Sequence, residues 1–187
     1  MLKPISAGLS ATLLMVGVSS LANAGLDREP MGAHEESADH GEETEHDFPE
    51  ARSYNVSKDA AADVDAALAR AGNTGKRVMI VMGANWCHDS RALAGWLETE
   101  RFAGLIEREY ELVFVNVGTP QSEGDGHNLH IARRFGVEEL PGTPNLLVVT
   151  AEGKLINAET ATTWRNAASR EEDAIYAELE ELANKAA

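Results

Sequence analysis

Cysteine is nearly absent from this sequence, since Cys87 is the only one among 187 residues. Such a chain cannot form an intramolecular disulfide, so the packing of its core must hold the fold together. The single thiol is then a reactive group, a buried inert side chain, or a link to another molecule.

Basic residues are also few. The chain has 16 Lys and Arg against 31 Asp and Glu, which gives a formal net charge of −15 at pH 7. A protein this negative repels nucleic acid and anionic membrane surfaces. We therefore expect neither as a partner.

Long apolar runs are missing as well. The segment LSATLLMVGVSSLA, within residues 1–24, is too short for a typical membrane span. It follows Lys3 and precedes Ala22-Asn23-Ala24, which is the pattern of a secretory signal and its cleavage site. We expect this segment to be removed on export, leaving a periplasmic or secreted protein that is not inserted in a membrane.

Residues 25–54 have too few large apolar side chains to form a core. They are rich in Glu, Asp and His, a composition typical of disordered segments, and so predict a disordered acidic tail. His34, His40 and His46 lie six residues apart among carboxylates, a spacing that suits weak binding of zinc or copper. We favour a solubilising tail without a metal, because this composition implies no fixed ligand geometry.

Residues 55–187 have the alternating pattern of a single α/β domain. The expected elements are a helix between Ser57 and Gly72, a buried strand at 76–84, a helical segment at 87–109 that bends or breaks near Thr99, a second buried strand at 110–118, a short helix at 129–137, a hairpin with strands in 140–150 and 151–157, and a last helix that begins at a capping box, Ser169 to Glu172. This order predicts a sheet of about four strands with helices on both faces.

Cys87 lies where the first predicted strand meets the following helix, in the first turn of that helix. Unpaired N–H groups and the positive end of the helix dipole favour a thiolate there. The hydroxyl of Ser90 is within reach of the sulfur, and His88 adds positive charge when it is protonated, whereas the carboxylate of Asp89 opposes a second negative charge. We interpret Cys87 as an activated thiol rather than an inert one.

Three segments together resemble the thioredoxin superfamily. They are Trp86-Cys87-His88-Asp89-Ser90 after a buried strand, Arg134-Phe135-Gly136-Val137 in a later short helix, and Pro141-Gly142-Thr143-Pro144 before a hairpin. The resemblance covers residues 57–187 in the order of elements, and it implies a thioredoxin-like fold with a central mixed sheet.

The resemblance also implies a site. The bond before Pro144 would be cis, with this proline facing Cys87, and the substrate-binding surface would consist of Trp86, His88, Thr143 and Pro144. Ser90 stands where the family has a second cysteine, so the step that expels a substrate from a mixed disulfide is missing. Val81 stands where many thioredoxins have a buried acid.

One-thiol chemistry remains. Cys87 would attack a disulfide or a glutathione adduct, and an external thiol, or the thiol freed in a scrambled substrate, would release it. The resemblance therefore implies a monothiol oxidoreductase or disulfide isomerase/reductase with Cys87 and Ser90 as catalytic residues. Its partners would be exported protein thiols and disulfides or glutathione, and it would need no bound cofactor.

Two other functions stay open. The first is a non-catalytic thioredoxin-fold protein that binds an exported client, or a soft metal through Cys87 and the tail histidines. The second is a dimer linked by a disulfide between two copies of Cys87. We expect a monomer, because a thiol in a groove is hindered from meeting its own copy.

Overall fold

The computed structural model describes residues 48–57, 59–119 and 128–186. The expected signal segment, residues 1–24, lies outside the described residues, and so do residues 25–47 with the three tail histidines. Within the described ranges, no helix combines the length and the apolar character needed to cross a bilayer.

The order of elements agrees with the pattern of the sequence. The described part contains α1 (Ala60–Thr74), β1 (Arg77–Gly83), α2 (His88–Glu98), α3 (Glu100–Glu109), β2 (Tyr110–Asn116), α4 (Leu129–Arg134), β3 (Asn145–Val149), the short 3-10 helix η2 (Ala167–Ser169) and α5 (Glu172–Asn184). The helical segment after Cys87 divides at Thr99, which ends α2 and precedes α3, so the expected break is confirmed.

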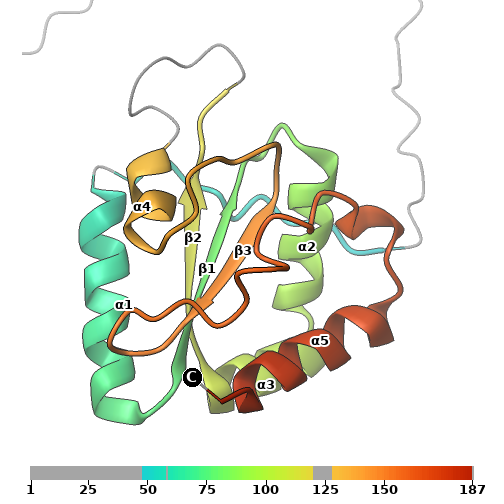
Figure 1. Cartoon of the computed structure of the whole chain (residues 1–187). Helices are drawn as coiled ribbons and strands as arrows, with labels where there is room; N and C mark the ends of the chain where they lie inside the picture. Colours follow the sequence, from blue (N-terminus) through green and yellow to red (C-terminus); the bar gives the residue numbers. More distant parts are fainter. Residues whose placement is uncertain (1–47, 58, 120–127, 187) are drawn as a thin grey trace, which may run out of the picture. The chain divides into compact units, whose positions relative to one another are not determined.

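The strands form one mixed sheet in the order β2-β1-β3. β1 runs parallel to β2 and antiparallel to β3. Successive side chains of a strand point to opposite faces, so Ile80 and Met82 pack in the cluster that contains α1 and α4, and Met79 and Val81 pack in the cluster that contains α2, α3 and α5. Figure 1 shows these two groups of helices on opposite sides of the sheet. The predicted mixed sheet, covered on both faces, is confirmed.

The expected fourth strand is reduced to a single bridge between Val149 and Leu155. The side chain of Asn157 takes over the pairing that a strand would provide. Its Nδ2 donates to the carbonyl oxygen of Leu146 at 2.9 Å, and its Oδ1 accepts from the N–H of Val148 at 2.9 Å. The sheet among the described residues therefore has three strands, because a side chain satisfies part of the edge of β3.

We expect Asn157→Ala to lower the free energy of unfolding by about 2–5 kcal/mol, because it leaves one buried donor and one buried acceptor of β3 without a partner. Urea denaturation measures this change. Asn184→Ala is the matched control: it removes an exposed bond from an asparagine Nδ2 to the carbonyl oxygen of Glu180, and it should cost less than about 0.5 kcal/mol. Equal effects of the two substitutions would contradict this role of Asn157.

Three predicted helix ends differ from the structure. Asp59, not Ser57, caps α1, because its Oδ1 accepts from the N–H of Ala62. The helix continues through Gly72 and ends at Thr74, and its C-cap is Gly75, whose φ of 75° lies in the left-handed region that glycine adopts without strain. The capping box expected at Ser169 does not form either, because this residue belongs to η2 and bonds to Asn166.

Residues 48–54, which the sequence places in the disordered tail, pack on the domain. We name this segment the N-terminal strap. The N–H of Ala51 donates to the carbonyl oxygen of Arg91 at 3.0 Å, the carbonyl of Pro49 lies against Gly95, and the side chain of Tyr54 is fully buried. The prediction of disorder is therefore wrong for the strap, because one buried aromatic and backbone hydrogen bonds anchor a segment that is polar on average.

Candidate functional site

Cys87 lies at the N-terminus of α2. It is the N-cap residue, with extended φ and ψ of −87° and 124°, and so it stands one position before the first turn in which the sequence places it. Its N–H donates to the carbonyl oxygen of Ala84 at 3.0 Å, closing the turn after β1. Among the described residues no side chain caps α2, and the thiol is half-buried. The N–H groups of the first helical turn are therefore placed to stabilise a negative charge on this sulfur.

The loop before β3 approaches Cys87 from the other side. The thiol donates to the carbonyl oxygen of Thr143 at 3.4 Å, across 56 positions of sequence, and the bond between Thr143 and Pro144 is cis. Pro144 is buried, whereas Thr143 is only partly buried. Thr143 therefore contributes the partly exposed surface beside the sulfur, whereas Pro144 belongs to the buried part of the loop.

Trp86 provides apolar surface next to the thiol. It is 51% exposed, and its Nε1 donates to the carbonyl oxygen of Gly118 at 2.6 Å. This bond holds one edge of the ring against the end of β2 while the rest of the ring faces solvent. Large exposed apolar side chains are otherwise rare among the described residues, so the position beside Cys87 favours a binding role.

Ser90 does not make the hydrogen bond to sulfur that the sequence suggests. It is fully buried, and its Oγ has no hydrogen-bond partner among the described residues. The sulfur donates to Thr143 instead. Ser90 Oγ and the ring of Tyr54 both lie within 3 Å of the position that a Cβ at Gly83 would occupy, so a residue larger than glycine does not fit there.

His88 is directed to the N-terminal strap. Its Nδ1 lies 3.3 Å from Oε1 of Glu50, and its ring makes an edge contact with Phe48 at 5.1 Å between centroids. The side chain is 46% exposed. His88 therefore has an acidic partner in the strap. The carboxylate of Glu50 offsets the positive charge that is expected from a protonated His88 near the sulfur.

The neighbouring carboxylate is also engaged. Oδ1 of Asp89 accepts from the N–H of Ala168 at 2.9 Å, which ties the start of α2 to η2. Arg91 pairs with Glu50 at 2.8 Å and donates to the carbonyl oxygen of Trp86 at 3.3 Å. The charged side chains of Asp89 and Arg91, at the start of α2, thus hold η2 and the strap in place.

The sequence did not reveal the part played by Tyr54. Asn85 pairs with its backbone through two hydrogen bonds of 3.1 Å, and Nδ2 of Asn116 donates to its carbonyl oxygen at 2.7 Å. Its hydroxyl donates to the carbonyl oxygen of Ser90 at 3.1 Å. The only sequence signal was a tyrosine at the end of a segment nearly free of large apolar side chains, which did not indicate contact with the site.

The environment of Tyr54 keeps its phenol neutral. Burial raises the pKa of Tyr54 well above its ordinary value, and negative charge on Cys87 raises it further, whereas the Ser90 side chain acts in the opposite direction. Tyr54 is therefore an uncharged hydrogen-bond donor, and its hydroxyl is bonded to Ser90, three positions after Cys87.

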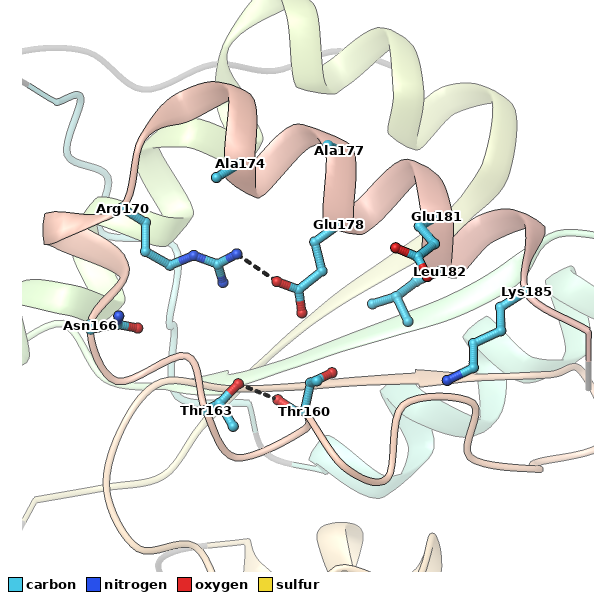
Figure 2. Close-up of a pocket in the computed structure, with 10 residues that line it drawn as sticks. All are labelled: Thr160, Thr163, Asn166, Arg170, Ala174, Ala177, Glu178, Glu181, Leu182 and Lys185. Atoms are coloured by element: carbon cyan, nitrogen blue, oxygen red, sulfur yellow. Dashed lines mark hydrogen bonds and ion pairs between the residues drawn. The ribbon is translucent and has the colours of Figure 1, made fainter.

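A cavity of about 600 Å³ lies elsewhere, between α5 and the segment 160–170 (Figure 2). Arg170 crosses it to pair with Glu178 and also stacks over the ring of Trp164, with 4.3 Å from its Cζ to the ring centroid. None of the residues expected at the site lines this cavity. In the part of the chain that the structure describes, no three His, Cys, Asp or Glu side chains gather in a way that could hold a metal.

Comparisons with known proteins agree with this geometry. Residues 59–151 match a protein family described as thioredoxin-like. No curated protein matches the chain. A similar solved structure is the crystal structure of a disulphide isomerase from Xylella fastidiosa Temecula1, with a TM-score of 0.61 and 30% sequence identity, covering 69% of this chain and 95% of that one. Fold, site and similarity lead to one conclusion: the chain belongs to the thioredoxin-like family.

Proposed function

We propose that this protein is an exported thiol–disulfide oxidoreductase that works through the single thiol of Cys87. The observation that carries the proposal is the position of this thiol, half-buried at the N-terminus of α2 and hydrogen-bonded to the carbonyl oxygen of Thr143, the residue before the cis Pro144. Helix N-termini favour thiolates, and a thiolate is the nucleophile of disulfide exchange. The 30% identity to a disulphide isomerase supports the same chemistry.

In the proposed reaction, Cys87 loses its proton to water and its sulfur attacks one sulfur of a substrate disulfide. One S–S bond forms and the substrate S–S bond breaks, and the leaving thiolate takes a proton from water. The N–H groups at the start of α2 stabilise the charge before attack. Trp86 and the exposed part of Thr143 flank the sulfur and hold the substrate.

Release requires another thiol, because Ser90 cannot attack the mixed disulfide. In isomerisation, the thiol freed in a scrambled substrate attacks the substrate sulfur of the mixed disulfide, so that a new substrate disulfide forms and Cys87 leaves as a thiolate. In reduction, one glutathione attacks the sulfur of Cys87 and releases the reduced substrate, and a second glutathione attacks the resulting Cys87–glutathione disulfide, which frees Cys87 and forms oxidised glutathione. Neither route needs a bound cofactor or a second thiol in this chain.

The proposed substrates are disulfides of exported proteins or their glutathione adducts, in the periplasm or outside the cell. This location rests on the secretory pattern of residues 1–24. An oxidising compartment supplies such substrates. We propose that the protein acts as a monomer, since the half-buried thiol of Cys87 is hindered from meeting the same thiol of a second copy.

The test is capture of a disulfide substrate. The chain without residues 1–24 should form a mixed disulfide with a glutathionylated peptide, detected as a mass increase, and Cys87→Ser should form none while keeping its circular dichroism spectrum. Turnover with added glutathione should fall by roughly 100-fold or more in the variant, because no other thiol can replace Cys87. A wild-type protein that captures no disulfide would refute the enzyme and favour a client-binding protein that uses the exposed Trp86.

A further inference from the structure

The hydroxyl of Ser90 is a buried polar group without a use in the thiol form of the protein. It is fully buried, and its Oγ has no hydrogen-bond partner among the described residues. A buried hydroxyl without a partner costs free energy, and an alanine of nearly the same size would avoid that cost. A hydrogen-bond partner for this hydroxyl would therefore have to be gained when the protonation of the site changes.

The sulfur of Cys87 is such a partner when it loses its proton. Cys87 is the N-cap of α2 and Ser90 is the third helical residue, and in helices the side chain at this third position reaches back toward the N-cap. The N–H of Cys87 is already satisfied by Ala84, so the Ser90 hydroxyl has no backbone donor there to accept from. As a thiol, Cys87 donates to Thr143; as a thiolate it can only accept.

Tyr54 reaches the other side of Ser90. Its hydroxyl donates to the Ser90 carbonyl oxygen, and its ring lies against Gly83 at the point where Ser90 Oγ also lies. Asn85 and Asn116 fix the backbone of Tyr54 through three hydrogen bonds, so the ring has little freedom to move away. Both side chains therefore meet beside Gly83, and a rotation of the Tyr54 O–H from the Ser90 carbonyl oxygen toward Ser90 Oγ is the movement that would join them.

We propose that Tyr54 is a positioning residue for the thiolate, acting through Ser90. In the thiolate state, the Tyr54 hydroxyl donates to Ser90 Oγ and the Ser90 hydroxyl donates to the sulfur of Cys87. In the thiol state the same two hydroxyls turn away, and the thiol donates to Thr143. The proposal rests on the proposed function. It gives the N-terminal strap a role at the site, because the strap supplies Tyr54.

The other charged groups near the sulfur are unchanged by loss of the Tyr54 hydroxyl. His88 and Arg91 share Glu50, and Asp89 is bonded to η2 through Ala168. None of these contacts involves the phenol. A change of Cys87 reactivity in Tyr54→Phe would therefore report the hydroxyl itself and not a rearranged ion pair.

The test is the pH dependence of Cys87 alkylation by iodoacetamide, a reaction of the thiolate that requires no enzymatic turnover. The midpoint pH should rise by about 1 unit in Ser90→Ala and by about half a unit in Tyr54→Phe, as expected when a thiolate loses hydrogen-bond donors. The double variant should match Ser90→Ala alone, because Tyr54 acts only through Ser90. Ser90→Ala should also melt no lower than the wild type, since its hydroxyl has no partner in the thiol form.

Tyr110→Phe is the matched control. Tyr110 is also buried, and its hydroxyl donates to the carbonyl oxygen of Leu179. Tyr110 begins β2 and Leu179 belongs to α5, and neither residue is part of the site. Both Tyr54→Phe and Tyr110→Phe remove a buried hydrogen bond and should lower the melting temperature, but Tyr110→Phe should leave the alkylation midpoint unchanged. An unchanged midpoint in Tyr54→Phe, or additive shifts in the double variant, would overturn the proposal. Because alkylation needs no substrate disulfide, this outcome is separate from failure of the capture experiment.

Discussion

Ser90→Cys is expected to turn the one-thiol site into a two-thiol site. Position 90 is buried and lies one helical turn after Cys87, and the hydroxyl that the substitution removes makes no hydrogen bond within the described part of the chain. The larger sulfur next to Gly83 and Tyr54 should cost only about 1–2 kcal/mol of packing. Mild oxidation should then join Cys87 to the new cysteine, and the count of free thiols should fall from two to none.

The same variant should resolve its own mixed disulfides. An attacking group held in place reacts as if it were present at very high concentration, so we expect the mixed disulfide with a glutathionylated peptide to decay roughly 100-fold faster, or more, than in the wild type. Mass spectrometry after acid quenching follows this decay. The result would show that only a missing resolving thiol separates this site from two-cysteine chemistry.

Thr74→Cys provides the matched control for an added thiol. Thr74 lies before the first residue of β1, whereas Cys87 follows its last residue, so the seven residues of this strand separate them by about 20 Å. Oxidation should leave both thiols of this variant free, and its mixed disulfides should live as long as those of the wild type. Two free thiols in oxidised Ser90→Cys would contradict the predicted arrangement around position 90.

Gly95→Ala is expected to release the N-terminal strap from α2. An alanine Cβ at this position would lie 2.1 Å from the carbonyl oxygen of Pro49 and 2.7 Å from the N–H nitrogen of Glu50, which are backbone atoms that no side-chain rotation can move. Alanine favours the helix by about 1 kcal/mol over glycine, so α2 itself should persist. The clash should therefore displace the strap, with a net loss of about 1–3 kcal/mol in the free energy of unfolding.

Tryptic cleavage after Arg52 measures release of the strap. This bond lies between Ala51, which donates to Arg91, and Tyr54, which is buried, so native packing protects it. We expect cleavage at least about tenfold faster in Gly95→Ala. Gly104→Ala in α3 is the control, because the nearest atom to its Cβ is a flexible arginine nitrogen at an ordinary 3.5 Å. If both variants gain stability and resist trypsin equally, the strap is not held as the structure shows.

Much of the fold could be predicted because its signals are local. β1 is a continuous apolar run, which is typical of a strand buried on both faces, and it is the central strand. Asn157 shows where such signals end. The residues before Asn157 have the turn and apolar pattern of a hairpin strand, but in the structure the Asn157 side chain, and not a strand backbone, pairs with β3. Whether a backbone or a side chain pairs there depends on where the segment lies along the edge of the sheet.

The sequence by itself determined the element order, the mixed α/β architecture, and the place of Cys87 at a strand-to-helix junction, because periodicity and helix-start signals depend on neighbours along the chain. Tertiary structure alone decided the surroundings of that thiol. Tyr54 comes from 33 positions before Cys87 and Thr143 from 56 positions after it. Tyr54 reaches Ser90, and Thr143 reaches the sulfur, only when the strap and the β3 loop pack on α2. Whether a hydroxyl such as that of Ser90 is buried or exposed depends on such packing, which no short stretch of residues records.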